Sequence, residues 1–349
     1  MFWVTLIVFL IILGLLVFVH ELGHFLAAKF SDVKVEEFAF GFPPRLLCRR
    51  RGETNYCINL IPFGGYVKML GEDSESESLR SFSKKRTRNK LLIIISGVLM
   101  NFILAGFLFA LGYMVGMSPI RVNPDKIGGI QDSKVLVAQV NENSPAQKFG
   151  MEVGDVIKGF ASSDDFSKFT KDNLGKNVKI TILRNQEEIT KDILVSNDIK
   201  APVGIGLVDI PTIKLGFLKA IKYGFLEMIL TTGYIFTMLK EVILGLFGGK
   251  ISEGVAGPVG IFNLTGEAIK MGFVYIVQWT ALLSINLGLI NILPFPALDG
   301  GRAIFILSEG IFRRKVIRSE IENILHFIGF VLLIIAIIAL TFSELIALI

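Results

Sequence analysis

Four long runs of apolar residues stand out from an otherwise mixed chain. They cover residues 1–19, 91–117, 273–298 and 324–342, and the first two contain no charged residue. An α-helix needs about 20 apolar residues to cross roughly 30 Å of hydrocarbon, and each run is about that long or longer. The pattern predicts an α-helical multi-pass membrane protein with about four transmembrane helices.

The first run could instead be a cleaved signal segment, but its features speak against this. No basic residue precedes it, and its apolar stretch is too long. The small residues of FLAAKF at 25–30 would offer a cleavage site, and cleavage there would discard the histidines discussed below. We therefore expect the run to remain as a helix.

Shorter patterns divide the rest of the chain into segments with different expected structures. We expect transmembrane helices within 1–30, 89–117, 273–302 and 324–349, cytoplasmic loops at 31–88 and 303–323, an extracytoplasmic α+β domain at 118–211, and interfacial amphipathic helices at 212–272. The first loop ends in an acidic and then a basic linker, GEDSESES followed by SKKRTRNK.

Residues 31–70 are rich in Val, Phe and Leu, which predicts strands. In IPFGGYVKML at 61–70, Gly64 and Gly65 interrupt an apolar stretch that is unusual for a cytoplasmic loop. We expect a membrane-associated β-hairpin there, which is possible at membrane depth only if protein covers its backbone. A tight hairpin would also place Cys48 opposite Cys57. On the cytoplasmic side we expect no disulfide between them.

Residues 118–211 have the pattern of a small soluble domain. VLVAQV at 135–140 and VKITIL at 178–183 are typical of strands. Between them, Ser144-Pro145 can begin a short helix that Gly150 ends. This order resembles the helix–turn–strand core of a PDZ domain, although Phe149 replaces a residue that is usually small. Another small α+β domain is the alternative.

Residues 215–248 are apolar but are interrupted by charged residues such as Lys222 and Glu227. A fifth span here would reverse the C-terminal half of the chain and place the basic segment after residue 302 outside. Because basic loops stay on the cytoplasmic side, we favour helices that lie along the outer membrane face. A fifth span is the alternative.

Charge sets the expected orientation. The 349 residues are 52% hydrophobic, with a mean hydropathy of +0.61 and a net charge of +5. Lys and Arg cluster at 84–90 and 302–318, beside the spans, so both loops are expected in the cytoplasm and both termini and 118–211 outside it. No basic patch is interleaved with aromatic residues, so we expect no nucleic-acid partner.

The stretch FVHELGHFL at 18–26 ends the first apolar run with three polar groups. His20 and His24 are one helical turn apart, which suits two imidazoles on one tetrahedral metal ion. In the H-E-x-x-H spacing, Glu21 is the expected general base for a metal-bound water. Ionisable groups in a span cost about 2.5 kcal/mol or more each, and a zinc ion would offset that cost. The alternative is that the three side chains only reach toward the headgroups.

A catalytic zinc site needs a third protein ligand and an open position. The carboxylates Glu36 and Glu37 are possible, but nothing in the sequence distinguishes them. Asp299 in NILPFPALDGG is the better candidate, because prolines interrupt the third apolar run beside it. The first and third spans run in the same direction, so both ligand sets are expected near the inner end of a span. An interfacial turn at Asp-Gly is the alternative for Asp299.

Three asparagines, Asn101, Asn286 and Asn291, lie within the apolar runs. Such side chains could bind a substrate backbone or stabilise an oxyanion. Gly97 precedes Asn101 by one turn, a spacing that permits close helix contact. Hydrogen bonding between helices is the alternative for each asparagine.

Together the motifs resemble the site-2 protease family of intramembrane zinc metalloproteases, in a bacterial branch with a single PDZ domain, of the regulator-of-sigma-E type. HELGH at 20–24, SGVLMN at 96–101, AGPVGI at 256–261 and NILPFPALDG at 291–300 carry the resemblance, with IPFGGYVKML as the β loop. It implies a zinc ion held by His20, His24 and Asp299, and Glu21 activating water. It also implies substrate contacts at Asn286 and Asn291, and we add Asn101, Gly64 and Gly65 to that expected substrate site.

The resemblance implies an enzyme of the bacterial inner membrane that cleaves single-span membrane proteins within the bilayer. Anti-sigma factors and remnant signal peptides are typical substrates, after a site-1-type protease has acted. Two other functions remain open: a membrane zinc hydrolase of lipidated or small substrates, and a non-catalytic PDZ scaffold with a structural metal. A structural site would supply four protein ligands, and three good candidates favour an open position.

Overall fold

A computed structural model describes residues 1–72, 76–128, 130–184, 187–199, 201–247, 256–314, 317 and 319–347. The chain forms two compact units, which are described separately. The first comprises Met1–Leu108, Met228–Glu267 and Gln278–Ile349, and the second comprises Phe109–Glu227 and Ala268–Val277.

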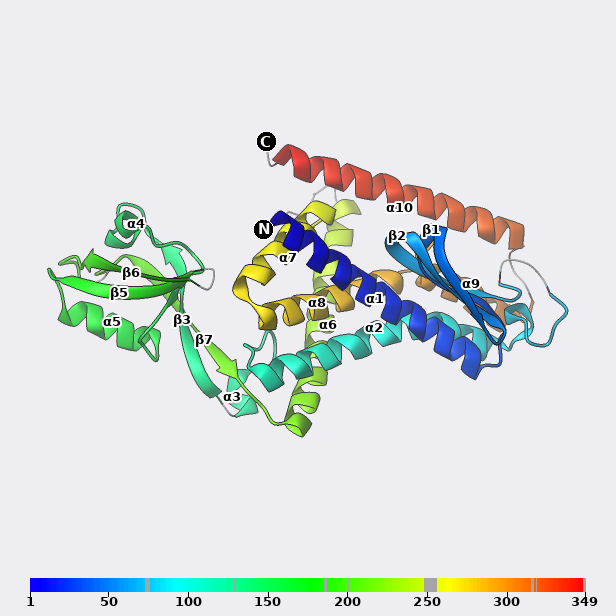
Figure 1. Ribbon diagram of the computed structural model, residues 1–349, viewed down its shortest axis with the longest axis horizontal. Helices are drawn as coiled ribbons and strands as arrows, with labels where there is room; N and C mark the ends of the chain where they lie inside the picture. The colour runs from blue at the N-terminus through cyan, green and yellow to red at the C-terminus, as the bar shows by residue number, and fades with distance from the viewer. Residues whose placement is uncertain are drawn as a thin grey trace. The chain divides into compact units, whose positions relative to one another are not determined.

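Four helices have the length and apolar character needed to cross a membrane, among the residues that the structure describes. They are α1 (Phe2–Phe30), α2 (Thr87–Val115), α8 (Phe273–Asn291) and α10 (Ser319–Ala347) (Figure 1). The structure therefore contains four candidate membrane-spanning helices in a mostly helical chain, the number predicted from the sequence. The third apolar run is helical only to Asn291, because Pro294 and Pro296 cannot continue the helix.

The helices α6 (Phe217–Phe247), α7 (Pro258–Met271) and α9 (Asp299–Phe312) lie between these candidate spans in the chain. α6 and α7 fall in the segment expected to hold interfacial helices, and their position on or across the membrane stays a prediction. α9 occupies much of the expected second cytoplasmic loop. Within the charged segments, residues 73–75 of the acidic linker and Lys315 and Arg318 of the basic loop lie outside the described residues.

Glu227, read above as a charge that interrupts an apolar helix, is fully buried within the second unit. It accepts a hydrogen bond from the Tyr113 hydroxyl at 2.6 Å and further bonds from backbone N–H groups of residues 120–122. A carboxylate with this many protein donors does not need water. The charge of Glu227 therefore does not indicate whether α6 lies on the membrane or crosses it.

The hairpin of β1 (Val35–Arg51) and β2 (Thr54–Met69) folds back on itself into a wider sheet. Residues 37–40 of β1 pair on one side with residues 55–58 and on the other with residues 65–68. Gly64, with a φ of 95°, lies between the two segments of β2 that flank residues 37–40. Among the residues that the structure describes, residues 65–69 pair only with residues 35–40, so they form an edge of this sheet.

The two cysteines lie opposite each other in the hairpin, as the symmetric spacing predicted. The structure also joins Cys48 and Cys57 in a disulfide, so the expectation of two unbonded cysteines is not met. Their Cα atoms are 4.1 Å apart, because directly opposed positions in an antiparallel pair bring the two side chains together. The expectation rested on the reducing cytoplasm and not on this geometry.

A small core packs the sheet against the helices that carry the polar motifs. It joins Ala28 on α1, Val67 on β2, Ile94 on α2 and Ile306 on α9. Side chains of this kind are buried because removing apolar surface from water is favourable by about 25 cal/mol per Å². The core therefore holds the C-terminal end of α1 and the N-terminal end of α2 beside β2 and α9.

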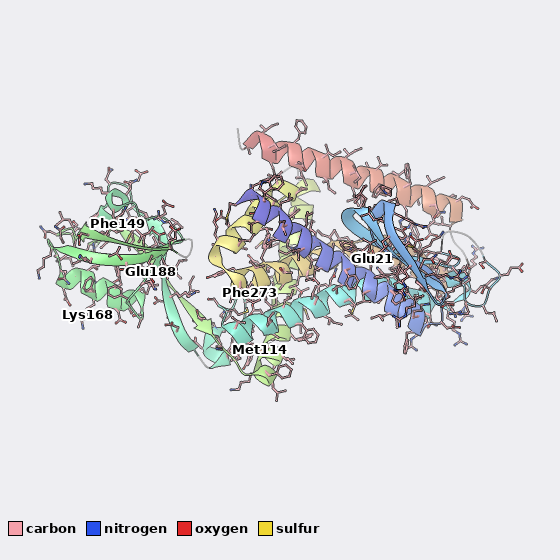
Figure 2. All side chains as sticks on the ribbon, in the orientation of Figure 1. Glu21, Met114, Phe149, Lys168, Glu188 and Phe273 are labelled. Carbon is pink, nitrogen blue, oxygen red and sulfur yellow. A yellow bond between two sulfur atoms is a disulfide. The ribbon has the colours of Figure 1, made fainter. Side chains whose placement is uncertain are left out.

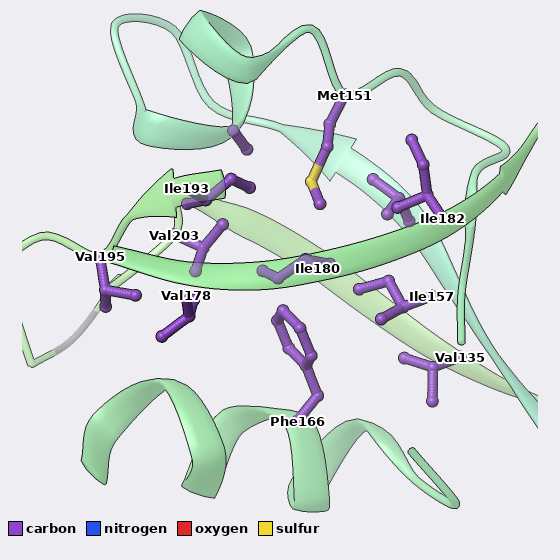
Figure 3. Close-up of a cluster of buried hydrophobic side chains, with 12 residues drawn as sticks. Val135, Met151, Ile157, Phe166, Val178, Ile180, Ile182, Ile193, Val195 and Val203 are labelled. Atoms are coloured by element: carbon purple, nitrogen blue, oxygen red, sulfur yellow. The ribbon is translucent and has the colours of Figure 1, made fainter. Parts of the chain in front are cut away.

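In the second unit, a five-stranded sheet has the order β6-β5-β4-β3-β7. The strands are β3 (Ile130–Val140), β4 (Val156–Ile157), β5 (Asn177–Arg184), β6 (Glu187–Leu194) and β7 (Ile205–Ile213), with helices α3 (Pro124–Ile127), α4 (Pro145–Phe149) and α5 (Ser163–Asp172). Phe166 of α5 packs with Ile180 and Val135 of the sheet in one buried cluster (Figure 3). The predicted start of α4 is confirmed, since the Ser144 hydroxyl accepts from Gln147 N–H, and Gly150 ends the helix at a φ of 80°.

Candidate metal centre

The two histidines of the H-E-x-x-H motif lie on the buried face of α1, near its C-terminal end. Each is only 7% exposed, in a helix that is mostly apolar. Their ring centroids are 4.8 Å apart with the planes nearly perpendicular, and their Nε2 atoms are 3.1 Å apart. One helical turn therefore brings both Nε2 atoms to the same point.

Asp299 reaches the same point from a distant part of the chain. It is the first residue of α9, and its Oδ2 lies 3.0 Å from His20 Nε2 and 3.3 Å from His24 Nε2. Among the described residues, these three side chains form the group whose geometry suits a metal ion. Glu36 and Glu37, the other carboxylates considered from the sequence, do not belong to it.

The geometry of the three atoms fits a tetrahedral metal ion. Ligand atoms about 2.0–2.2 Å from a tetrahedral zinc ion are roughly 3.3–3.6 Å apart, close to the separations given above. His24 Nδ1 lies 2.8 Å from the Ile93 carbonyl oxygen, so it donates a proton there, and Nε2 of a neutral ring then carries a lone pair. Asp299 Oδ2 is buried and makes no hydrogen bond of good geometry. A cation bound between the three atoms would satisfy acceptors that converge in this way.

Residues of α2 contact both imidazole rings through their Nδ1 atoms. Besides the His24 contact with Ile93, the Asn101 amide nitrogen lies 3.2 Å from His20 Nδ1. Asn101 is fully buried, and its amide oxygen has no partner among the described residues. At Gly97 a Cβ atom would lie 2.4 Å from His24 Nε2, so only glycine leaves room for the ring. The spacing of Gly97 and Asn101 thus serves contact between α1 and α2.

The candidate centre opens into a cavity of about 610 Å³. Glu21, labelled in Figure 2, also lines this cavity, and its side chain lies beside β2. A Cβ atom at Gly65 would lie 3.1 Å from Glu21 Cγ, so the sheet edge passes directly over this carboxylate. The cavity is lined by residues of α1, the β1–β2 sheet and the segment after it, α2, the loop before α9, α9 and α10. These residues are His20, Glu21, His24, Phe42, Gly65–Met69, Glu72, Ile94, Ala297–Asp299, Arg302, His326 and Phe330.

Residues 65–69 of the sheet edge are held by a buried polar group. Glu37 accepts hydrogen bonds from the Tyr66 hydroxyl and from the Arg45 guanidinium, both at 2.5 Å. Burial, together with the hydrogen bond to Glu37, raises the pKa of Tyr66 above its ordinary value. Tyr66 therefore stays protonated and keeps donating to Glu37 over the whole physiological pH range.

The remaining residues expected to contact substrate are distributed unevenly. Gly65 lines the cavity, and Gly64 lies against the Phe42 ring. Asn286 is half-buried in the interior of α8, and Asn291 is its last residue. Neither asparagine, nor Asn101, is among the described residues that line the cavity.

The sequence reasoning missed the contribution of α10. Ala297, two residues before Asp299, donates its N–H to His326 Nδ1 at 2.9 Å. His326 and Phe330 line the cavity, and Glu72 pairs with Arg302 at another part of its wall. The one available signal was a histidine within the fourth apolar run, where a polar side chain needs a partner.

Comparison with known proteins points to a peptidase. Residues 8–336 match the model of peptidase family M50. A Clostridium acetobutylicum protein, provisionally named a zinc metalloprotease, is 38% identical over 95% of this chain and 94% of its own. The Oceanobacillus iheyensis zinc metalloprotease RasP is 29% identical over 97% of this chain and 98% of its own. The Bacillus subtilis regulator of sigma-W protease RasP is 29% identical over 99% of both chains.

Proposed function

Because the chain belongs to peptidase family M50, we propose that it is a zinc metalloendopeptidase that cleaves peptide bonds in the transmembrane segments of single-span membrane proteins. The observation that carries this proposal is the convergence of His20, His24 and Asp299 beside Glu21 on a buried cavity. Only three donor groups converge among the described residues, which favours a catalytic site with an open position over a structural metal site.

In this proposal His20 and His24, through Nε2, and Asp299, through Oδ2, hold the zinc ion. When bound, zinc polarises the scissile carbonyl and makes a nearby water easier to deprotonate. Glu21 takes the proton from the attacking water and then gives it to the leaving amine. The carboxylate is well placed for both steps because α1 presents it to the same cavity as the ligands.

We assign Asn101 a positioning role toward His20. A metal ion on His20 Nε2 requires the proton to be on Nδ1, where it needs an acceptor. A half-turn of the Asn101 amide, whose two ends are interchangeable in shape, presents the otherwise unpaired oxygen to that proton. This role replaces the substrate contact expected for Asn101, because its side chain is fully buried.

The sheet edge offers a place for an unwound substrate. A helical peptide bond has its carbonyl engaged, so the substrate must become extended before it is attacked. Residues 65–69 line the cavity and pair with residues 35–40 on one side, so an extended substrate can add as a further strand on the other. Substrate helices weakened by glycine or proline are expected to be preferred, because they unwind at lower cost.

The remaining parts of the proposal concern location and partners. We place the enzyme in the bacterial cytoplasmic membrane, with both termini and residues 118–211 outside the cytoplasm. Residues 118–211 act as a PDZ-like domain that influences substrate access, and a site-1-type protease acts before this enzyme. The sigma-W role named for the Bacillus subtilis relative supports anti-sigma factors as one substrate class, with remnant signal peptides as another.

A cleavage assay in vesicles tests the proposal. The purified full chain is reconstituted with a single-span peptide that carries a glycine near the middle of its helix. We expect cleavage within the span, loss of cleavage when a chelator removes zinc, and recovery when Zn²⁺ is restored. Glu21→Gln is expected to lower turnover by roughly 100-fold to 10,000-fold, the range contributed by a general base.

The matched control is the zinc content of the same variant. Glu21→Gln should keep stoichiometric zinc, because its side chain is not a ligand. Turnover at the wild-type rate by Glu21→Gln would remove it as the base. Cleavage that survives complete removal of zinc would overturn the metalloprotease mechanism.

A further inference from the structure

The loop that carries Asp299 contains a strained turn. Leu298 donates its N–H to the Phe295 carbonyl oxygen at 3.1 Å, which closes a four-residue turn over Phe295–Leu298. Pro296 occupies the second position, and Ala297 occupies the third with a φ of 80°. These are the features of a type II turn, in which the third residue is normally glycine. An alanine there is unfavourable unless the surroundings hold it in place.

α10 supplies the contact that holds this turn. In a type II turn the N–H of the third residue is not used by the turn itself. Ala297 donates that N–H to His326 Nδ1 at 2.9 Å. One helical turn further along α10, a Cβ atom at Gly329 would lie 2.4 Å from the Pro296 carbonyl oxygen, so the helix packs directly on the turn.

The His326 ring acts at this place through one nitrogen atom only. Its Nδ1 accepts a proton, so the neutral ring carries its own proton on Nε2. Nε2 is buried without a hydrogen-bond partner among the described residues, and Glu322 Oε1 is 3.9 Å away, too far for such a bond. The Phe305 ring packs edge-on against the imidazole. Among the described residues, the hydrogen bond from the Ala297 N–H is therefore the one that the ring makes.

We propose that His326 is a positioning residue for the metal centre: by holding the Phe295–Leu298 turn it fixes Asp299 opposite His20 and His24. The inference rests on the metal role proposed above for these three residues. Asp299 follows the turn directly as the first residue of α9, so the turn determines where its carboxylate begins. The Ala297 N–H is partly buried, and without its acceptor the strained turn would shift toward other conformations.

The experiment measures the Zn²⁺ affinity of the full-length protein in detergent, by competition with a chelator. His326→Asn places an amide oxygen where Nδ1 lies, and it should bind zinc within about threefold of the wild type. His326→Gln reaches instead to the position of Nε2. It should bind zinc roughly tenfold more weakly, as found for partners that orient metal ligands. Phe327→Leu, at a neighbouring exposed position of α10, is the control and should not change the affinity.

A second substitution tests the strain in the turn. Ala297→Gly adopts the left-handed conformation without penalty, so it should restore most of the zinc affinity of His326→Gln. A role of His326 in general packing predicts no such rescue. Zinc binding by His326→Gln as tight as in the wild type would overturn the proposal. A tenfold loss of zinc affinity in a folded His326→Asn would also overturn the proposal. This measurement decides the question even if His326→Gln does not fold.

The wild type separates this inference from the proposed function. If the wild-type protein binds no zinc, or if Asp299→Ala binds it equally well, the metal site itself is wrong. If the wild type binds zinc through Asp299 and both His326 variants match it, the metal site stands and only the positioning role fails.

Discussion

The histidines and the aspartate reach the candidate metal centre by different routes. His20 and His24 are carried by one regular helix, and their spacing alone places both Nε2 atoms together. Asp299 follows a strained turn after α8 has ended, and it depends on a contact from α10. One half of the centre is therefore built locally, and the other half is assembled from segments far apart in the sequence.

This difference determines which neighbours matter for each half. On the helix side, α2 supports rings that are already in place, through Ile93 and Asn101. On the loop side, the supporting contact must also hold an unfavourable backbone conformation. We therefore expect changes near the histidines to act through the rings, and changes near Asp299 to act through the shape of the turn.

Removing one ligand from each half should have the largest effect. His24→Ala and Asp299→Ala are each expected to weaken Zn²⁺ binding by more than about 100-fold, beyond the range seen for partners outside the first coordination shell. The measurement is zinc content and affinity of the purified full chain, with Glu21→Gln as the control that keeps zinc. Stoichiometric zinc in Asp299→Ala would mean that the loop half is not part of the site.

Closely packed glycines allow each half to be disturbed without removing a ligand. At Gly97 a Cβ would lie 2.4 Å from His24 Nε2, and at Gly300 a Cβ would lie 2.2 Å from the Ile292 carbonyl oxygen. Overpacking of this kind typically costs about 1–3 kcal/mol, or roughly 5-fold to 150-fold if it is expressed in zinc affinity. We expect Gly97→Ala to be worse than Gly300→Ala, because a loop can shift more readily than two packed helices.

The control for this pair is Gly233→Ala, since a Cβ there meets nothing within 4 Å. It should leave zinc affinity unchanged. If Gly300→Ala lowered the affinity more than Gly97→Ala, the loop would be the more rigid half and the comparison would be reversed.

The same contrast explains what could be predicted from the sequence. The spans, the H-E-x-x-H pair and the opposed cysteines depend on local spacing, and the structure places each as the pattern indicates. The second pairing of residues 37–40 and the His326 contact depend on tertiary folding. No local period encodes them. Asn101 lies between these cases: a hydrogen bond between helices was the alternative to the expected substrate contact, and its histidine partner was not predicted.

Asn101 tests whether the helix half needs its outer support. Asn101→Leu is expected to weaken zinc binding by roughly tenfold, because His20 Nδ1 would lose its acceptor in a buried place. Asn101→Asp keeps an acceptor oxygen and should stay close to the wild type. If Asn101→Leu instead raised KM while zinc affinity remained unchanged, the side chain would act on substrate, as first expected from the sequence.

The far end of α10 should have the smallest effect on the metal centre. Glu344 accepts N–H bonds from Gly257 at 2.7 Å and from Val259 and Gly260 at 3.1 Å, so it caps the start of α7 within the AGPVGI stretch. A carboxylate at a helix N-terminus contributes about 0.5–2 kcal/mol, so Glu344→Ala should lower the melting temperature by a few degrees. Zinc affinity should change less than twofold, because His326 lies five turns away along the helix. A tenfold loss of zinc affinity in Glu344→Ala would show that a change at one end of α10 shifts the whole helix. The position of the loop that carries Asp299 would then depend on all of α10 and not on His326 alone.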